Sequence, residues 1–211
     1  MKKTIAITMI VLGIILVSYQ PTLDYIIKPY LLDKEYDKAL NLSHETITAN
    51  TTVSREPQFD FNAIDSLNSS EINEIDIKKE DVLGSITVPS VSMELPILYG
   101  TTNESLNVGA GTMKPDQQMG EGNYALAGHN NTNRSLLFAP IRHIEKGDDI
   151  ILSDGKHQYV YEMVDSEVVE PHRTEVIEDV EGKETLTLVS CYSDDGSDRI
   201  IVHGELKRVV E

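Results

Sequence analysis

From residue 82 onward the chain shows short runs in which apolar and polar residues alternate, separated by glycine, proline and polar residues. A period of two puts successive side chains on opposite faces of an extended backbone, so the pattern indicates strands with a buried face. We predict strands at residues 82–88, 92–99, 123–127, 149–152, 157–164, 184–191 and 198–202. Short helices are expected near residues 102–108 and 135–142. Many short strands at this spacing predict a β-sandwich or a closed barrel.

The N-terminal segment is an uncharged apolar run that follows two lysines. The run extends from Thr4 to Tyr19, which is shorter than the roughly 20 residues that usually cross a bilayer. It must therefore include residues up to Leu23 or thin the bilayer locally. No small-x-small cleavage pattern follows the run, which favours an uncleaved membrane anchor over a cleaved signal peptide. Because Lys2 and Lys3 precede it, we expect a single-pass protein of the cell membrane with a cytoplasmic N-terminus and the remainder outside the cell.

Changes in composition along the sequence predict four parts. These are a cytoplasmic start (residues 1–3), a membrane anchor (4–23), an extracytoplasmic tether (24–80) and a main domain (81–211). Prolines interrupt the tether, so we expect only short helical pieces there. Its apolar residues Phe59, Phe61 and Ile64 are candidates for docking on a groove of the main domain. The chain is thus interpreted as one globular domain with an N-terminal appendage.

Composition excludes several classes of function. The net charge is −17 and the acidic residues are spread along the chain, which argues against binding to nucleic acid. With a single cysteine, no intramolecular disulfide can form. The sequence shows neither the spacing of a zinc or calcium site nor a phosphate-binding glycine loop. We therefore expect no metal and no cofactor.

The single cysteine stands in a pattern that favours chemistry. Cys191 ends the strand predicted at 184–191, a short polar turn follows, and Arg199 lies at the start of the next strand. Two strands joined by so short a turn run side by side in opposite directions, which brings the thiol near the guanidinium. A nearby cation favours the thiolate, so Cys191 is a candidate nucleophile. The alternative is a buried cysteine that acts only as a small apolar residue.

Among the six histidines, His129 has the position most typical of a catalytic group. It follows a run of small residues that leaves the strand at 123–127, and the polar stretch 130–133 after it is expected to be a loop. Loops on a rigid scaffold commonly carry function. Together with a lone cysteine elsewhere in the chain, His129 is the best candidate for the general acid and base.

Three features together resemble the class A sortases, the membrane-anchored cysteine transpeptidases of Gram-positive bacteria. The stretch Thr-Leu-Val-Ser-Cys at 187–191 resembles the Thr-Leu-x-Thr-Cys motif of this family, with Ser190 in place of the second threonine. Arg199 falls on the essential arginine of the family, and Ala-Gly-His at 127–129 resembles its histidine motif. The resemblance covers roughly residues 82–207 and implies an all-β fold, a closed eight-stranded barrel with short helices after a membrane anchor.

The resemblance also implies the roles of the catalytic residues. Cys191 would attack the carbonyl between Thr and Gly of a Leu-Pro-x-Thr-Gly sorting signal and form a thioester acyl-enzyme. His129 would protonate the leaving amine and later deprotonate the incoming amine. Arg199 would hold the substrate backbone and stabilise the oxyanion. The expected partners are surface proteins that carry the signal, a peptidoglycan precursor that supplies the acceptor amine, and the membrane.

By the same resemblance an apolar groove binds the sorting signal, and residues 165–183 form its mobile side. The residues assigned to substrate binding are Ala127, Val169, Pro171, Val176, Ile177, Val189 and Ser190. Family members that use calcium carry acidic residues before the histidine motif. Here Lys114, Gln117 and Gln118 occupy that stretch, and only Asp116 and Glu121 are acidic. We therefore predict that activity does not depend on calcium.

Three alternatives stay open at the level of sequence. The first is a sortase of another class, such as class D, with a different sorting signal. The second is a cysteine peptidase in which water, and not an amine, resolves the thioester. The third is a membrane-tethered module that binds the cell wall without catalysis, and whose function would survive replacement of Cys191 by alanine.

Overall fold

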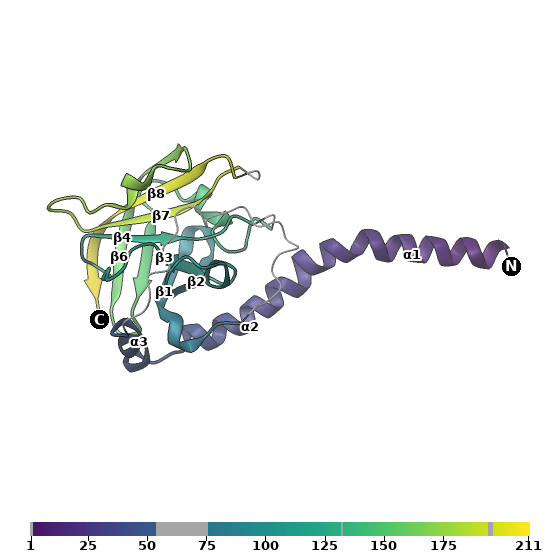
Figure 1. Ribbon diagram of the computed structural model, residues 1–211, viewed down its shortest axis with the longest axis horizontal. Helices are drawn as coiled ribbons and strands as arrows, with labels where there is room; N and C mark the ends of the chain where they lie inside the picture. Colours follow the sequence, from purple (N-terminus) through teal and green to yellow (C-terminus); the bar gives the residue numbers. More distant parts are fainter. Residues whose placement is uncertain (1, 54–75, 132, 194–195) are drawn as a thin grey trace.

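Eight strands close into a barrel in the computed structural model, which describes residues 2–53, 76–131, 133–193 and 196–211 (Figure 1). Around the barrel the strands follow the order β1–β2–β3–β4–β7–β8–β6–β5. Their bounds are Val82–Val88, Met93–Leu98, Ala110–Thr112, Asn123–Ala127, Asp149–Ser153, Gln158–Val169, Thr185–Cys191 and Arg199–Val210, for β1 to β8. Two neighbouring pairs are parallel, β2 with β3 and β4 with β7, and the other pairs are antiparallel. The predicted closed barrel is confirmed.

The strands differ from the predicted ones at three places. The three-residue β3 was missed, because a segment this short shows no alternation. Both β6 and β8 run longer than predicted, because they pair with each other from Gln158↔Val210 to Val169↔Arg199. Of the predicted short helices, the first is α4 at Asn103–Leu106, and the second is a 3₁₀ segment at Ala139–His143.

Alternation along the strands divides the apolar side chains between the barrel interior and an outer face. The interior cluster includes Leu126 of β4, Leu188 of β7 and Val202 of β8, and its largest fully buried side chains include Tyr161 and Phe138. The outer cluster includes Ala127 of β4, Val189 of β7 and Ile201 of β8, which lie one residue away from the interior positions. β4, β7 and the first part of β8 are therefore buried on both faces.

The anchor helix continues through residue 40, into the tether where only short helical pieces were predicted. It consists of α1 (Lys2–Thr22), a π-helical segment η1 (Leu23–Ile27) and α2 (Lys28–Leu40), and it continues through both Pro21 and Pro29. By length and composition it is apolar enough to cross a membrane, and none of the residues in its most apolar stretch is buried. The helix therefore fits a single-pass membrane anchor.

The helices beyond the anchor pack on the barrel. Leu32 and Ala39 of α2 are buried in one cluster with Val82 of β1 and Leu98 of β2. The next helix, α3 (His44–Thr51), is capped by Ser43 and lies against β1 (Figure 1). Much of the segment expected to be a tether is therefore held against the barrel. The proposed docking residues Phe59, Phe61 and Ile64 lie outside the described residues.

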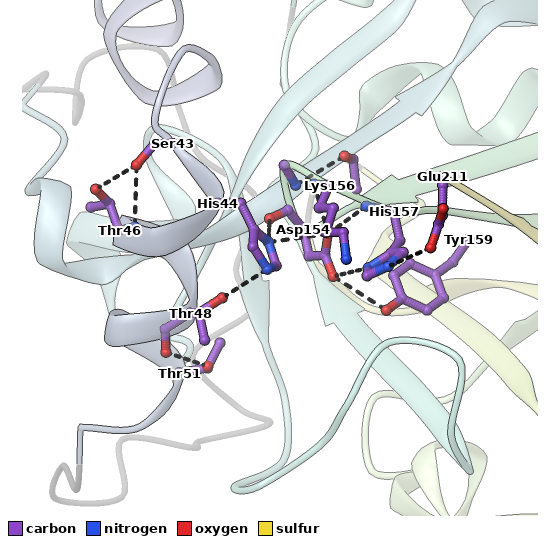
Figure 2. Close-up of polar contacts among 12 residues, drawn as sticks. Ser43, His44, Thr46, Thr48, Thr51, Asp154, Lys156, His157, Tyr159 and Glu211 are labelled. Carbon is purple, nitrogen blue, oxygen red and sulfur yellow. Dashed lines mark hydrogen bonds and ion pairs between the residues drawn. The ribbon is translucent and has the colours of Figure 1, made fainter.

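Polar contacts fix α3 to the turn between β5 and β6, and Figure 2 shows Asp154 between His44 and His157. His44 Nδ1 lies 3.0 Å from the main-chain oxygen of Asp154. The Asp154 carboxylate accepts hydrogen bonds from the N–H groups of Lys156 (2.9 Å) and His157 (2.7 Å). It also lies 3.1 Å from Nδ1 of His157 and accepts a hydrogen bond from the Tyr159 hydroxyl at 3.3 Å. One carboxylate thus holds the turn on which α3 rests.

We predict that replacing Asp154 with asparagine destabilises the protein in a pH-dependent way. Burial raises the pKa of Asp154, but the hydrogen bonds from the main chain of His157 and Lys156 and from the His157 ring lower it more, so the net pKa lies below its ordinary value. Because the folded-state pKa is depressed, the stabilisation is complete above the unfolded-state pKa of about 4 and is lost as the pH falls through the folded-state pKa. At pH 7, Asp154→Asn should lower the free energy of unfolding by about 1–2 kcal/mol.

The measurement is urea denaturation of the full chain in detergent at neutral and at acidic pH. Asp33→Asn, at an exposed position on α2, serves as the matched control and should change the stability little at either pH. An Asp154→Asn variant whose loss of stability is the same at both pH values would contradict this account of the turn.

Candidate active site

Cys191 and Arg199 face each other across two neighbouring strands. Cys191 is the last residue of β7, Arg199 is the first of β8, and the two are direct partners in the antiparallel ladder. Both are almost completely buried, with 1% and 3% of their surface exposed. Arg199 Nη1 donates hydrogen bonds to the main-chain oxygens of Gly196 (3.0 Å) and Asp198 (2.9 Å), which hold the guanidinium at the turn. The predicted antiparallel pairing of the two strands, which makes Cys191 and Arg199 neighbours, is confirmed.

His129 follows the end of β4, the strand that pairs with β7 on the side away from β8. β4 and β7 are parallel, with Ala127 opposite Val189, and the N–H of Gly128 continues the pairing with a 3.1 Å hydrogen bond to the oxygen of Val189. Extending this register by two residues places His129 next to Cys191. The histidine is fully buried, and its main-chain oxygen accepts a hydrogen bond from the N–H of Phe138 at 3.1 Å.

Gly128 is required because the Phe138 ring packs directly on it. A Cβ atom at residue 128 would lie only 2.3 Å from Cγ of Phe138. The ring covers the chain where it leaves β4, so any side chain here would displace either Phe138 or His129. The middle residue of the Ala-Gly-His sequence is therefore a glycine because Phe138 leaves no room for a side chain.

Strand alternation sorts the predicted substrate residues by face. Ala127, Val189, Cys191 and Val169 belong to one apolar cluster on the outer face, and Val176 and Ile177 pack against it. This cluster also contains Leu106, Met113, Ala125 and Ile201, which the sequence analysis did not identify. Because Ala125 lies two residues before Ala127 on the same strand, strand alternation would have predicted that both side chains lie on one face.

Two predicted substrate residues lie apart from this cluster. Ser190 pairs with Ile200, a member of the interior cluster, so its side chain lies on the strand face opposite to Cys191. Its buried hydroxyl has no hydrogen-bond partner in the part of the chain that the structure describes. Pro171 is half-buried beyond the end of β6 and does not belong to the cluster.

The loop predicted at 165–183 begins later than expected. Residues 165–169 are the last part of β6, paired with β8 from Asp165↔His203 to Val169↔Arg199. The family resemblance assigned these residues to the loop, but the long β8 strand supplies them with a partner. The remaining loop, here called the groove loop (residues 170–184), includes the 3₁₀ segment Thr174–Ile177.

Asn123, at the start of β4, holds the groove loop against the barrel strands β4 and β7. Its buried side-chain amide donates hydrogen bonds to the main-chain oxygens of Val176 (3.2 Å) and Glu178 (3.0 Å). Its side-chain oxygen accepts a hydrogen bond from the hydroxyl of Thr187 at 2.9 Å. Thr187 is on β7, four residues before Cys191, so one side chain joins the loop to the strand of the thiol.

Asp179 forms a second, more exposed connection between the groove loop and β4. Its carboxylate accepts hydrogen bonds from the N–H of Asn123 at 2.9 Å and from Nζ of Lys114 at 2.6 Å. The hydrogen bond from Lys114, followed by that from the Asn123 N–H, lowers the pKa of Asp179 below its ordinary value. The carboxylate is therefore ionised at neutral pH, when Lys114 is positively charged.

Arg142 connects the segments that follow the thiol and the histidine, a role that the sequence analysis missed. Its Nη2 donates a hydrogen bond to the main-chain oxygen of Tyr192 at 3.0 Å and lies 3.4 Å from the side-chain oxygen of Asn130. Its guanidinium also lies 5.1 Å from the centre of the Tyr192 ring. Tyr192 follows Cys191 and Asn130 follows His129, so Arg142 ties together the two ends of the site. No sequence motif marks this residue.

The chain is similar to known proteins of one family. The model of the Sortase domain family matches residues 86–207. The chain is 43% identical to sortase A of Bacillus anthracis over 148 residues, which cover 70% of each protein. It is 33% identical to sortase A of Listeria monocytogenes over 211 residues, covering 99% of this chain and 92% of the relative.

The fold agrees with a solved structure from the same group. The crystal structure of sortase A from Listeria monocytogenes matches with a TM-score of 0.60 at 38% identity, covering 61% of this chain and 89% of that one. The region that the family model matches, residues 86–207, includes Cys191 and Arg199.

We predict that Asn123→Ala loosens the groove loop and destabilises the protein. The substitution removes the donors for Val176 and Glu178 and leaves the Thr187 hydroxyl without this acceptor, so the free energy of unfolding should fall by about 2–3 kcal/mol. Amide hydrogen exchange should accelerate in the groove loop before it does so in β1 or β5.

Lys114→Met is the matched control, because it removes only an exposed ion pair, worth about 0–1 kcal/mol. If Asn123→Ala accelerates exchange no more than Lys114→Met does, Asn123 is not what holds the loop.

Proposed function

The chain belongs to the sortase family, among its class A members, and we propose that it is a membrane-anchored cysteine transpeptidase whose nucleophile is Cys191. The observation that supports this most strongly is that Cys191 pairs with Arg199 across β7 and β8, while β4, which pairs with β7 on its other side, leads two residues later to His129. The substrate would be a surface protein with a Leu-Pro-x-Thr-Gly sorting signal. The acceptor would be the amine of a peptidoglycan precursor.

In the proposed first half-reaction, the Cys191 thiolate attacks the carbonyl carbon between Thr and Gly. The oxyanion that forms is stabilised by Arg199, whose Nε is buried and has no hydrogen-bond partner among the described residues. When the C–N bond breaks, His129 gives a proton to the leaving glycine amine. The product is a thioester between Cys191 and the threonine of the substrate.

In the second half-reaction an acceptor amine attacks the thioester. His129 takes the proton that the amine loses, the C–S bond breaks, and the Cys191 thiolate is restored with a new amide bond to the threonine. The apolar cluster of Ala127, Val169 and Val189, covered by the groove loop, suits the leucine and proline of the signal. Ser190 lies on the opposite strand face, so a direct role for its hydroxyl has less support than the roles of the three catalytic residues.

The proposed location follows from the helix and the lysines that precede it. The single apolar helix would cross the membrane once, with Lys2 and Lys3 in the cytoplasm and the barrel outside the cell. This arrangement places the thioester on the side where cell-wall precursors are displayed.

The test is incubation of the full chain in detergent with a Leu-Pro-x-Thr-Gly peptide, with and without a glycine-based or diaminopimelate-type amine, followed by mass analysis of the products. We expect cleavage between Thr and Gly and attachment of the amine to Thr. Cys191→Ala should reduce the rate by at least about a thousandfold, and Arg199→Lys by about a hundredfold or more.

The products also discriminate the alternatives. Only the free acid, even with an amine present, would favour a hydrolytic peptidase. Cleavage of a different signal peptide in a panel would favour another sortase class, such as class D. No cleavage, together with wall binding that survives Cys191→Ala, would favour a binding module.

We also predict that calcium does not activate the enzyme. The Lys114 ammonium group lies 2.6 Å from the Asp179 carboxylate on the groove loop and supplies a positive charge where the loop meets β4. Gln117 is engaged with the main chain of Ala125, at 3.0 and 3.1 Å. Within the described part of the chain, no group of three or more His, Cys, Asp or Glu side chains is arranged to hold a metal ion.

The measurement is the transpeptidation rate after chelation and again after addition of calcium, which should agree. A several-fold rise with calcium would contradict the prediction.

A further inference from the structure

The surface of the N-terminal helix stays uncharged well beyond the predicted anchor. Between Thr4 and Leu31 the only charged residues are Asp24 and Lys28, and both are buried. The large apolar or aromatic side chains exposed on this part of the helix include Tyr25 (60%), Ile26 (65%), Ile27 (41%), Tyr30 (70%) and Leu31 (40%). A soluble helix would not normally expose so many of them together.

The exposed surface changes abruptly after Leu31. The next exposed residues along α2 are Asp33, Lys34, Asp37 and Lys38. Before this boundary, Ile26 and Tyr30 are four residues apart and therefore share one side of the helix. Asp24, Lys28 and Leu32, also spaced by four residues, form the buried side. The exposed side is thus apolar up to Leu31 and charged beyond it.

The buried side contacts the loop that follows His129. Nδ2 of Asn133 donates a 3.1 Å hydrogen bond to the main-chain oxygen of Asp24, and this contact is buried. Near this contact, the N–H of Lys28 bonds to the oxygen of Leu23 in η1, one residue further back than in an α-helix, and Pro29 has no N–H to donate. On the same side, Nζ of Lys28 lies 3.0 Å from the Asp24 carboxylate.

The length of the uncharged surface matches a whole bilayer. At about 1.5 Å per residue, the helix rises about 42 Å from Thr4 to Leu31. The hydrocarbon core of a bilayer is about 30 Å thick, and the bilayer with its headgroup regions is about 40–45 Å thick. The nine residues beyond α1, from Leu23 to Leu31, rise about 13 Å, which is more than enough to cross an outer headgroup region of about 5–8 Å. Tyrosines such as Tyr25 and Tyr30 are typical of that region.

We propose that Tyr25, Ile26, Tyr30 and Leu31 lie in the outer headgroup and acyl region of the membrane, so that the barrel rests directly on the bilayer. The inference deepens the proposed function, since it assumes that the N-terminal helix is a membrane anchor. Through Asn133, the helix then places the loop after His129 beside the lipid surface. An acceptor amine carried on a lipid reaches the thioester without leaving the membrane.

The occupant of the apolar face is lipid, because the face continues directly from the membrane span. A net charge of −17 does not attract the barrel to an anionic bilayer. Apolar contact and the helix itself are what keep the barrel at the surface. The paired Asp24 and Lys28 face the barrel and not the lipid, as expected for charges near a membrane.

Because the chain contains no tryptophan, single tryptophans report the depth of chosen positions. The full-length variants Tyr30→Trp, Tyr19→Trp and Val53→Trp would be reconstituted in phosphatidylcholine and phosphatidylglycerol vesicles. Lipids brominated near the carbonyl end of the acyl chains act as quenchers from the membrane, and acrylamide acts as a quencher from water. Tyr19 lies in the anchor, and Val53 is an exposed position after α3.

We expect the tryptophan at position 30 to lose most of its emission with brominated lipid and to be shielded from acrylamide, as at position 19, whereas position 53 shows the reverse. Quenching at position 19 but not at position 30 would overturn the inference and leave the anchor intact. Shielding of position 30 from both quenchers would point to a protein partner on this face and would also overturn it. If position 19 is not quenched by lipid, the anchor itself is wrong.

Discussion

The parallel pairing of β4 with β7 is the constraint on which the site depends. β7 carries Cys191 at its end, and β8 returns beside it with Arg199, an arrangement that any tight hairpin would provide. The parallel neighbour of β7 is β4, so both strands end at the same edge of the barrel. The residues that follow the end of β4 are Gly128 and His129. A closed barrel keeps this order rigid, because no strand is left with an unpaired edge.

Alternation along the same strands separates stability from chemistry. Interior positions such as Leu188 fill the barrel, while Val189 and Cys191 face outward into an apolar cluster beneath the groove loop. Asn123 connects the two functions, because its buried side chain holds the groove loop and also accepts a hydrogen bond from β7. The groove wall is thereby attached to the strand that carries Cys191.

Contacts between segments close in the sequence could be predicted from it, whereas contacts that depend on pairing between distant strands could not. The adjacency of Cys191 and Arg199 followed from a short turn, whereas the neighbourhood of His129 rested on a family resemblance because β4 and β7 are far apart in the chain. Residues 165–169 were assigned to a loop by the family resemblance, but they pair with distant residues of β8. The helix through Pro21 and Pro29 was likewise missed, because the π-helical segment that accommodates the second proline has no sequence signature.

The measurement that tests the central claim most directly is the intact mass of the enzyme during reaction with a sorting-signal peptide in the absence of an acceptor amine. The account predicts a covalent adduct with the mass of the peptide up to its threonine, located on the fragment that contains Cys191 and released by hydroxylamine, as a thioester requires. Turnover of the peptide without an adduct, or an adduct on another residue, would contradict the assignment of Cys191 as the nucleophile between His129 and Arg199.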